Sequence, residues 1–429
     1  MSYRFSGAVL GAALASTAAM VNAADLLSVY RSALENDPSY QIAASQHDAA
    51  QQAIAIAQSA KRPTLGLNAV ATASDNSRLD ENSLTAGLTG RIPLFNRSNN
   101  LRVDAARASA AGADADLIAA EQSLALRSAQ LYFGVLRARD SLLFARDELK
   151  AFERQLEQTD GRYEVGLVAI TDVKEAQASF DSAQASVLVA ENQLATALQA
   201  LKVTTGDFPE SFATLRDNIE LKQPQPANVE LWVRKAADNS PEILAARETN
   251  EAARADLGLA KATTSPTLDL EATVSETKSD VDLNDNFGNR ALRLTLGVPL
   301  YTGGARAAST RQARLLLTAA EQQLELTQRE VERDIRNSYA DVASAISRVN
   351  ALARALESST TGLEATQAGF DAGTRTNVDV LNAIRSESNA KAQLAGARYD
   401  YMLALLELHA LVGELGEAEI SEINDWLIR

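Results

Sequence analysis

Residues 64–74 read TLGLNAVATAS and residues 84–94 read LTAGLTGRIPL, so that apolar side chains alternate with largely polar ones in both stretches. A period of two puts the apolar side chains on one face of a β-strand. The polar residues from Asp75 to Asn82 would form the turn between the two strands. Each stretch has about ten residues, the length of a strand in an outer-membrane barrel. The two stretches therefore predict a β-hairpin with one apolar and one polar face.

A second hairpin of the same kind lies in the other half of the chain. Residues 268–275 and 292–298 alternate in the same way, and the polar segment from Lys278 to Asn289 would connect them. Pro93 and Pro299 each stand at the end of a predicted strand, where proline's missing N–H group would turn the chain from sheet into helix. The sheet of a soluble two-layer protein would show similar alternation.

The number of strands predicts that several chains share one barrel. Unpaired strand edges are not tolerated in lipid, so a sheet in a membrane has to close on itself. Closed barrels have about eight strands or more, whereas this sequence offers four. We therefore expect an oligomer in which the strands of neighbouring chains complete the barrel.

Both hairpins belong to an internal duplication, in which the two halves match at an offset of about 207 residues. The matching pairs include Tyr132 and Tyr339, Gly166 and Gly373, Asp172 and Asp379, Val173 and Val380, Leu201 and Leu408, and Gly206 and Gly413. The first repeat would span residues 24–205 with its hairpin at 63–95, and the second would span 241–412 with its hairpin at 266–301. The first repeat is followed by residues 206–240 and the second by the tail 413–429. Both segments would form an equatorial belt, a region of mixed structure around the middle of the helices.

Outside the hairpins the period changes to seven, which is typical of coiled-coil helices. Leu117, Leu124 and Leu131 are seven residues apart, and the pattern then slips by four residues to Val135. Such a slip locally unwinds a left-handed supercoil, so the helices can pack nearly straight. No proline interrupts residues 101–160, which predicts a helix roughly 90 Å long. A coiled-coil scaffold without any conduit would contain the same helices.

The first 23 residues have the pattern of a signal peptide. Arg4 precedes an apolar stretch from Ala8 to Ala15, and Val21-Asn22-Ala23 suits signal peptidase. We expect residues 1–23 to be removed and the mature protein to begin at Ala24 outside the cytoplasm. An uncleaved N-terminal helix is the alternative. No later segment has the ~18 continuous apolar residues of a membrane helix, so insertion into a membrane would have to use the strands.

Composition argues against several other functions. The formal net charge of -15 disfavours nucleic-acid binding, because phosphates have to be neutralised by basic residues. The chain has no cysteine, which excludes disulfides and thiolate chemistry. His47 and His409 are the two histidines, and neither stands in a cluster with metal-ligand spacing. The sequence therefore predicts no catalytic residue, no metal site and no cofactor.

Two further segments carry a family resemblance: residues 162–173 read RYEVGLVAITDV, and residues 372–381 read AGTRTNVDVL. With these motifs the mature chain resembles, over its whole length, the TolC family of outer-membrane efflux and type I secretion proteins. The resemblance implies a homotrimer whose twelve strands form one barrel in outer-membrane lipid, continued by a helical tunnel through the periplasm. It also implies docking to a periplasmic adaptor (membrane fusion) protein and, through it, to an inner-membrane RND pump or ABC transporter.

In that family, hydrogen bonds and ion pairs between coiled helices close the periplasmic end of the tunnel. Matched to the two motifs residue by residue, the resemblance implies a gate latch, the contacts that hold the tunnel closed, at Thr171, Asp172, Phe370 and Arg375. It also implies a pore constriction at Asp379 and Asn382. Where this chain has Phe370, the family commonly has tyrosine. Where it has Asn382, the family has a second acidic residue in the constriction. Both the latch and the block by multivalent cations would therefore be weaker in this chain.

The same motifs also have the pattern of helix ends and helix starts. Gly166 and Gly373 would be the glycines that end the preceding helices. Asp172 and Asp379 would then be capping residues, an interpretation compatible with a place at the gate. Arg375 would not serve as a cap, because the helix dipole disfavours a cation at a helix start. Its position favours an ion pair with a carboxylate, and Asp172 is the candidate.

The fold class predicted from these features is an α+β membrane protein. Long helices form a coiled-coil barrel, and four strands contribute to a shared transmembrane β-barrel. The favoured function is a passive exit duct for small molecules, for proteins of type I secretion, or for both. A soluble periplasmic coiled-coil adaptor or scaffold is the alternative of a different class, and the strand alternation argues against it. An enzyme is not expected.

Overall fold

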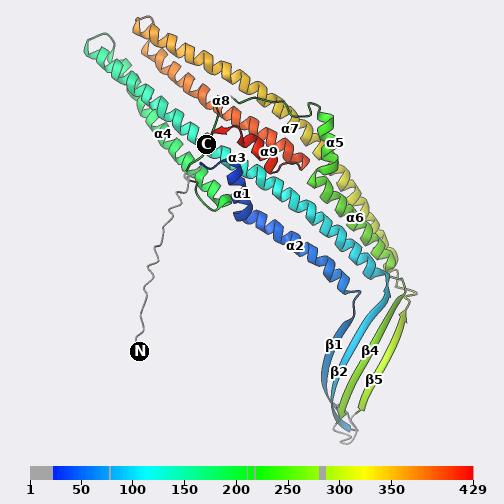
Figure 1. Ribbon diagram of the computed structural model, residues 1–429. Helices are drawn as coiled ribbons and strands as arrows, with labels where there is room; N and C mark the ends of the chain where they lie inside the picture. The colour runs from blue at the N-terminus through cyan, green and yellow to red at the C-terminus, as the bar shows by residue number, and fades with distance from the viewer. Residues whose placement is uncertain (1–22, 77–78, 210, 217–218, 280–286, 429) are drawn as a thin grey trace, which may run out of the picture.

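The computed structural model describes residues 23–76, 79–209, 211–216, 219–279 and 287–428 (Figure 1). The predicted signal peptide, up to position 22, lies outside the described residues. The described chain is elongated, with a β-sheet at one end and helices that reach the other end. Within these ranges, no helix combines the length and the apolar character needed to cross a membrane.

Four antiparallel strands form the sheet, in the order β1 (Thr64–Asn76), β2 (Leu79–Asn96), β4 (Thr267–Ser279) and β5 (Phe287–Gly297). The pairs β1–β2 and β4–β5 are the two predicted hairpins, and β2 pairs with β4. The hairpins of both repeats are thus joined into one sheet, with β1 and β5 at its edges.

The register of the strands confirms the predicted alternation. Leu67 lies opposite Leu88, which in turn lies opposite Val274, so apolar residues of neighbouring strands share one face. Leu67 is 77% exposed in the single chain. On the other face, Arg91 forms an ion pair with Asp269 at 3.2 Å. The sheet therefore presents one face suited to lipid and one suited to water.

The turns of both hairpins are shorter than the predicted segments 75–82 and 278–289, which is a correction to the sequence analysis. β1 continues to Asn76 and β2 begins at Leu79, while β4 continues to Ser279 and β5 begins at Phe287. The backbone hydrogen bonds of an antiparallel ladder do not depend on apolar side chains. Strand pairing therefore continues past the point where the apolar pattern stops.

Pro93 lies inside β2 rather than at its end, which is a second correction. The strand runs on to Asn96, and its register against β4 shifts between Pro93 and Phe95. Proline has no N–H group to donate, so it disturbs the ladder locally without ending the strand. Pro299 does follow its strand, because β5 ends at Gly297.

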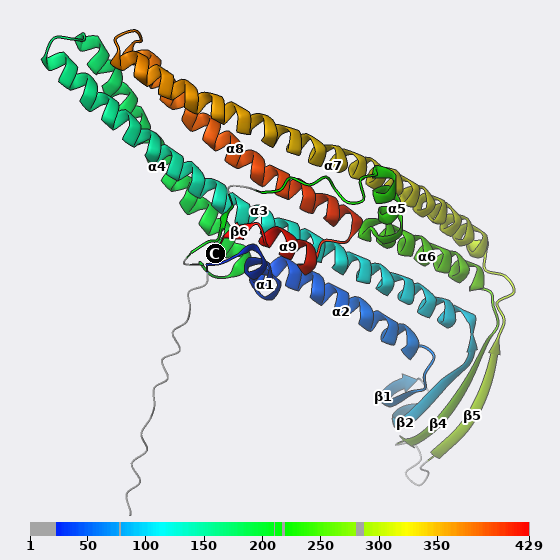
Figure 2. The same cartoon turned by 45° about the horizontal axis from the view of Figure 1, so that its top comes forward.

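Each repeat contributes one very long helix, α3 (Arg97–Glu164, 68 residues) and α7 (Ala305–Asp371, 67 residues). Each leads into a second helix, α4 (Ile170–Thr205) or α8 (Asn377–Val412). Toward the sheet, α2 (Pro38–Ser59) and α6 (Pro241–Ala262) join them, so that α2, α3, α6 and α7 lie side by side (Figure 2). The helix predicted at 101–160 is confirmed and is slightly longer at both ends.

Heptad positions supply the core between these helices. Leu124, Val135 and Leu142 of α3 are buried, and so are Val331 and Val342 of α7. The four-residue slip before Val135 thus keeps the apolar stripe on the packed face of α3.

Short elements gather around the middle of the long helices. They are α1 (Leu26–Asn36), α5 (Val229–Asn239), α9 (Glu417–Asn424) and the paired strands β3 (Thr214–Leu215) and β6 (Leu427–Ile428). Tyr132 of α3 is buried beneath them, and its hydroxyl donates to the Ala213 carbonyl at 2.9 Å. Beyond this belt the pairs α3–α4 and α7–α8 continue to the end opposite the sheet (Figure 1).

Candidate functional site

Two helical turns at the end opposite the sheet contain the motifs singled out in the sequence. Residues 165–169 connect α3 to α4, and residues 372–376 connect α7 to α8. Gly166 and Gly373 have φ angles of 74° and 73°, the left-handed region that favours glycine after a helix end. The predicted helix-ending role of both glycines is confirmed.

Asp379 is a capping residue, as one interpretation of the sequence predicted. Its carboxylate accepts hydrogen bonds from the N–H group of Thr376 at 3.0 Å and from the Thr376 hydroxyl at 2.8 Å. Both bonds hold the pKa of Asp379 below its usual range, and the bond from the Thr376 N–H group has the larger effect. The nearby Arg375 lowers this pKa as well. Asp379 therefore carries its negative charge at the start of α8 at neutral pH.

The other predicted site residues lie near the same two turns. The Asp172 carboxylate accepts from the Ala169 N–H group at 3.2 Å in the first turn of α4. Thr171 and Asn382 are exposed. Arg375 is exposed, packs its side chain against Gly369 and forms no ion pair with Asp172 within the described part of this chain. Their roles in a latch and a constriction stay predictions.

Arg162, in the last turn of α3, links the two helical pairs of the chain. Its guanidinium donates to the Phe370 carbonyl at 3.1 Å and to the Asp371 carboxylate at 2.9 Å, and lies 4.2 Å from the centroid of the Phe370 ring. Gln158, also on α3, donates to the same Asp371 oxygen at 2.8 Å. Phe370, a predicted latch residue, thus stands at a contact between the two pairs, with Arg162 as its partner.

Asn377 forms a second, buried link. Its side-chain oxygen accepts from the amide of Gln155 at 2.8 Å and from the hydroxyl of Thr159 at 3.2 Å, both on α3. Its side-chain amide donates to the backbone carbonyl of Asp172 on α4 at 3.0 Å. Asn377, Gln155 and Thr159 are all at most 3% exposed. Both ends of the Asn377 amide are therefore paired across the junction of the two helical pairs.

A small apolar core adjoins these polar links. It brings together residues of all four helices, namely Phe152, Ala183, Phe370, Val380, Leu381 and Ile384. A groove of about 610 Å³ runs between α3 and α7, with Gln158 and Asp371 among its lining residues. The polar links thus stand beside both a packed core and a groove open to solvent.

Sequence reasoning missed Arg162, Gln158, Asp371 and Asn377, although two signals pointed to them. Asp371 ends α7, where the helix dipole disfavours an anion, and the last turn of α7 contains no basic residue. A cation from another element was therefore needed. Asn377 occupies the position of Ile170 in the first repeat, so an amide replaces an apolar residue at a packed position.

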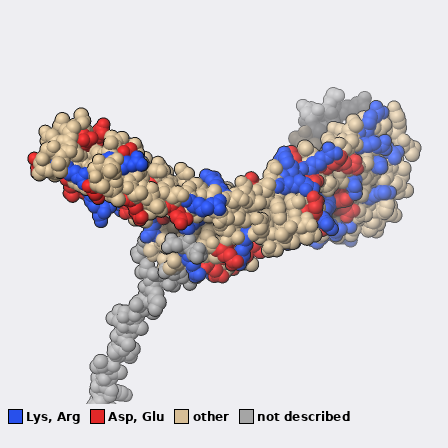
Figure 3. Space-filling model, turned by 90° about the horizontal axis from the view of Figure 1, so that it is seen from above, with Lys and Arg blue, Asp and Glu red and all other residues tan. Residues whose placement is uncertain are grey.

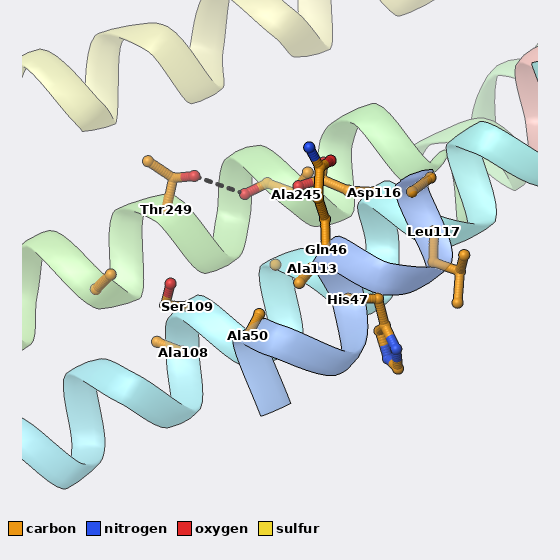
Figure 4. Close-up of a pocket in the computed structure, with 13 residues that line it drawn as sticks. Gln46, His47, Ala50, Ala108, Ser109, Ala113, Asp116, Leu117, Ala245 and Thr249 are labelled. Atoms are coloured by element: carbon orange, nitrogen blue, oxygen red, sulfur yellow. Dashed lines mark hydrogen bonds between the residues drawn. The ribbon is translucent and has the colours of Figure 1, made fainter. Parts of the chain in front are cut away.

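A separate hollow of about 600 Å³ lies between α2, α3 and α6 (Figure 4). Six of its thirteen lining residues are alanine. Two of its polar side chains have partners: the Thr249 hydroxyl donates to the Ala245 carbonyl at 2.9 Å, and His47 pairs with Asp114 at 2.8 Å. Among the described residues, no group of three His, Cys, Asp or Glu side chains is placed to hold a metal ion. Basic and acidic side chains are interspersed on the face drawn in Figure 3.

Comparison with known proteins agrees with this architecture. The family described as outer membrane efflux protein matches residues 29–207 and 232–414. The outer membrane protein TolC of Vibrio cholerae is 38% identical over 425 residues (97% of this chain and 96% of that protein), and TolC of Escherichia coli is 33% identical over 436 residues (98% and 88%). The crystal structure of the Vibrio cholerae outer membrane protein VceC has a TM-score of 0.77 at 24% identity and covers 91% of this chain and 97% of its own. This chain therefore belongs to the outer membrane efflux protein family and is a TolC-type channel subunit of the outer membrane.

Proposed function

We propose that this chain is one subunit of a passive, trimeric exit duct that carries small molecules, secreted proteins or both out of the cell. The sheet is the observation that carries the proposal. One of its faces exposes large leucines, the other is polar, and helices of 68 and 67 residues lead away from it. Lipid suits the first face and a water-filled bore suits the second. The energy for transport would come from a partner pump.

Membership of the family implies a trimeric channel. The unpaired edges of the sheet and the exposed apolar side chains of the outer helices support this assembly. Among the described strands, β1 and β5 each have an unpaired edge, which lipid does not tolerate. The outer helices also expose apolar side chains, with Ile56 of α2 70% and Leu315 of α7 67% exposed. Pairing of β5 with β1 of the next chain would close the barrel.

The proposed gate lies at the helical turns opposite the sheet. Its latch residues are Thr171, Asp172, Phe370 and Arg375, and its constriction residues are Asp379 and Asn382. Because the Arg375 side chain is exposed and has no ion pair with Asp172 inside one described chain, we assign this pair to neighbouring chains.

The turn between α3 and α4 supports docking of a periplasmic adaptor protein. Val165, Leu167 and Ile170 are 70%, 73% and 47% exposed there. Large apolar side chains gathered on one turn favour burial against a partner. An inner-membrane RND pump or ABC transporter would be reached through that adaptor, while outer-membrane lipid surrounds the sheet.

The mass of the detergent-extracted protein tests this proposal. We expect salt washes to leave the protein in the outer-membrane fraction, and the complex released by detergent to contain three chains. A periplasmic adaptor or scaffold would be recovered without detergent, because none of its surfaces would face lipid. Recovery as a salt-extractable monomer would therefore contradict the duct.

A further inference from the structure

The apolar face of the sheet contains a hollow of about 460 Å³. Leu67, Leu88 and Val274 lie opposite one another on three strands and line one side of it. The small residues Ala86 and Gly288 lie in the next row, nearer to the hairpin turns. A Cβ atom added to Gly288 would meet no other atom within 4 Å. The hollow therefore has room for a stretch of hydrocarbon chain.

Two basic residues lie on this same apolar face. Arg290 is opposite Val274 and lines the hollow, and Lys278 is opposite Leu84, closer to the turns. Glu276 lies on β4 between these two rows, so the three side chains together leave one positive charge in excess. None of the three forms an ion pair within the described part of the chain. The face that suits lipid thus contains a cation that still needs an anion.

The positions of Arg290 and Lys278 along their strands give their depth in the membrane. Leu296 and Leu268 lie opposite each other near the helices, where the apolar pattern of this face begins. Arg290 is six residues from Leu296, which is roughly 20 Å along a strand and about 15 Å of height at a tilt of 35–45°. Lys278 is ten residues from Leu268, or about 25 Å of height. Because the lipid-facing band of a barrel is about 25 Å tall, Arg290 lies in its outer half and Lys278 at its outer edge.

A guanidinium at that depth requires an anion, because hydrocarbon solvates its charge poorly. The long side chain of Arg290 can extend outward to the level of the lipid headgroups. Phosphate groups are the anions there, and a guanidinium binds a phosphate through two parallel N–H···O bonds. Lys278, at the edge of the band, can bind phosphate as a point charge.

We propose that Arg290, Lys278 and this hollow bind a phosphorylated glycolipid of the outer leaflet, with its phosphates on the two cations and one acyl chain in the hollow. The hairpin turns lie at the end of the molecule away from the long periplasmic helices, which places the site in the outer leaflet (Figure 1). Lipopolysaccharide, the glycolipid of that leaflet, has phosphates next to several acyl chains. The inference goes beyond the exit duct, because it assigns a ligand to the lipid-facing side of the sheet.

Native mass spectrometry of the full-length complex, extracted from outer membranes and freed of lipid in detergent, tests the site. The complex is titrated with lipid A carrying two phosphates, with dephosphorylated lipid A, and with phosphatidylglycerol. We expect one bisphosphorylated lipid A per chain, and binding of the other two lipids that is weaker by about tenfold or more, because charge-assisted hydrogen bonds are lost. Equal binding of the three lipids would overturn the proposal.

Two variants separate the role of the cation from that of the hollow. Arg290→Gln removes a charge from a lipid-facing position, so the complex should still assemble, and lipid A should bind about tenfold more weakly. Ala86→Phe fills the hollow and leaves both cations in place, and it should weaken binding about fivefold by excluding the acyl chain. Wild-type affinity in Arg290→Gln would overturn the proposal, whatever the result for Ala86→Phe.

Arg293→Gln is the matched control, because it makes the same change on the same strand. Arg293 lies opposite Glu271 on the polar face of the sheet, away from the hollow. Its loss should leave lipid A binding unchanged, and a decrease as large as that of Arg290→Gln would contradict a site on the apolar face. A complex that binds lipid A as expected but gives no conductance in a planar bilayer would overturn the duct and leave the lipid site standing.

Discussion

Arg375 lies exposed just before α8, at a helix start where the dipole disfavours a cation. Within one chain its side chain packs on Gly369, and no ion pair with Asp172 forms among the described residues. A cation at a helix start that forms no ion pair within the described part of its own chain suggests an ion-pair partner on another chain. In a trimer, each such contact would be repeated at three junctions.

Replacing Arg375 by serine should therefore loosen the gate. Exposed ion pairs contribute about 0–1 kcal/mol each, so the three junctions together would shift the balance of closed and open states without affecting assembly. We expect Arg375→Ser to raise single-channel conductance in planar bilayers. Arg107→Ser, which removes an exposed arginine of α3 far along the chain from the turns, serves as the control. Conductance equal to that of the wild type would remove Arg375 from the latch.

Distance along the sequence decided which residues at the two helical turns could be predicted from the sequence. The glycine at 373 and the capping role of Asp379 follow from neighbours within a few residues, and both are confirmed. Arg162 and Asp371 are 209 residues apart, and their contact depends on how two helical pairs lie against each other. No local pattern encodes that placement, so sequence reasoning identified Phe370 but not the arginine over its ring.

The two faces of strand β1 should differ sharply in their tolerance of charge. Leu67 lies on the apolar face, and its neighbour Asn68 points to the opposite face. Leu67→Arg would bring a cation into lipid, which costs about 2–4 kcal/mol near the middle of a bilayer. Asn68→Arg would place the same side chain in the water-filled bore at no comparable cost.

The amount of trimer recovered from outer membranes measures this difference. We expect Leu67→Arg to reduce the folded trimer strongly and Asn68→Arg to leave it close to the wild-type amount. Equal recovery of the two variants would mean that the apolar face does not contact lipid. A larger loss for Asn68→Arg would mean that the two faces have been exchanged.

Element type was easier to predict than element boundaries. Periods of two and seven correctly separated strands from helices, because each period records which face of an element is buried. The ends were less accurate, because backbone pairing continues where side-chain patterns stop. β2 passes through Pro93, and the strands of both hairpins extend into the polar segments expected to be turns.

Across the described chain, the duplication places two equivalent hairpins in one sheet and two equivalent helical pairs at the far end. Four strands cannot close a barrel, so the function depends on neighbouring chains as much as on this fold. The duplication and the need for an oligomer could both be inferred from the sequence. The asymmetry at the helical turns could not, because Asn377 stands where the first repeat has Ile170, and Gly369 stands where it has Arg162, at a junction visible only once the helices are packed.

Three chains that enclose one continuous water-filled bore would conduct ions, so the conductance of a planar lipid bilayer shows whether the bore exists. Protein purified in detergent from outer membranes should insert and produce discrete, uniform conductance steps, each arising from one trimer. Absence of any conductance step from protein recovered as an intact trimer would contradict a continuous bore.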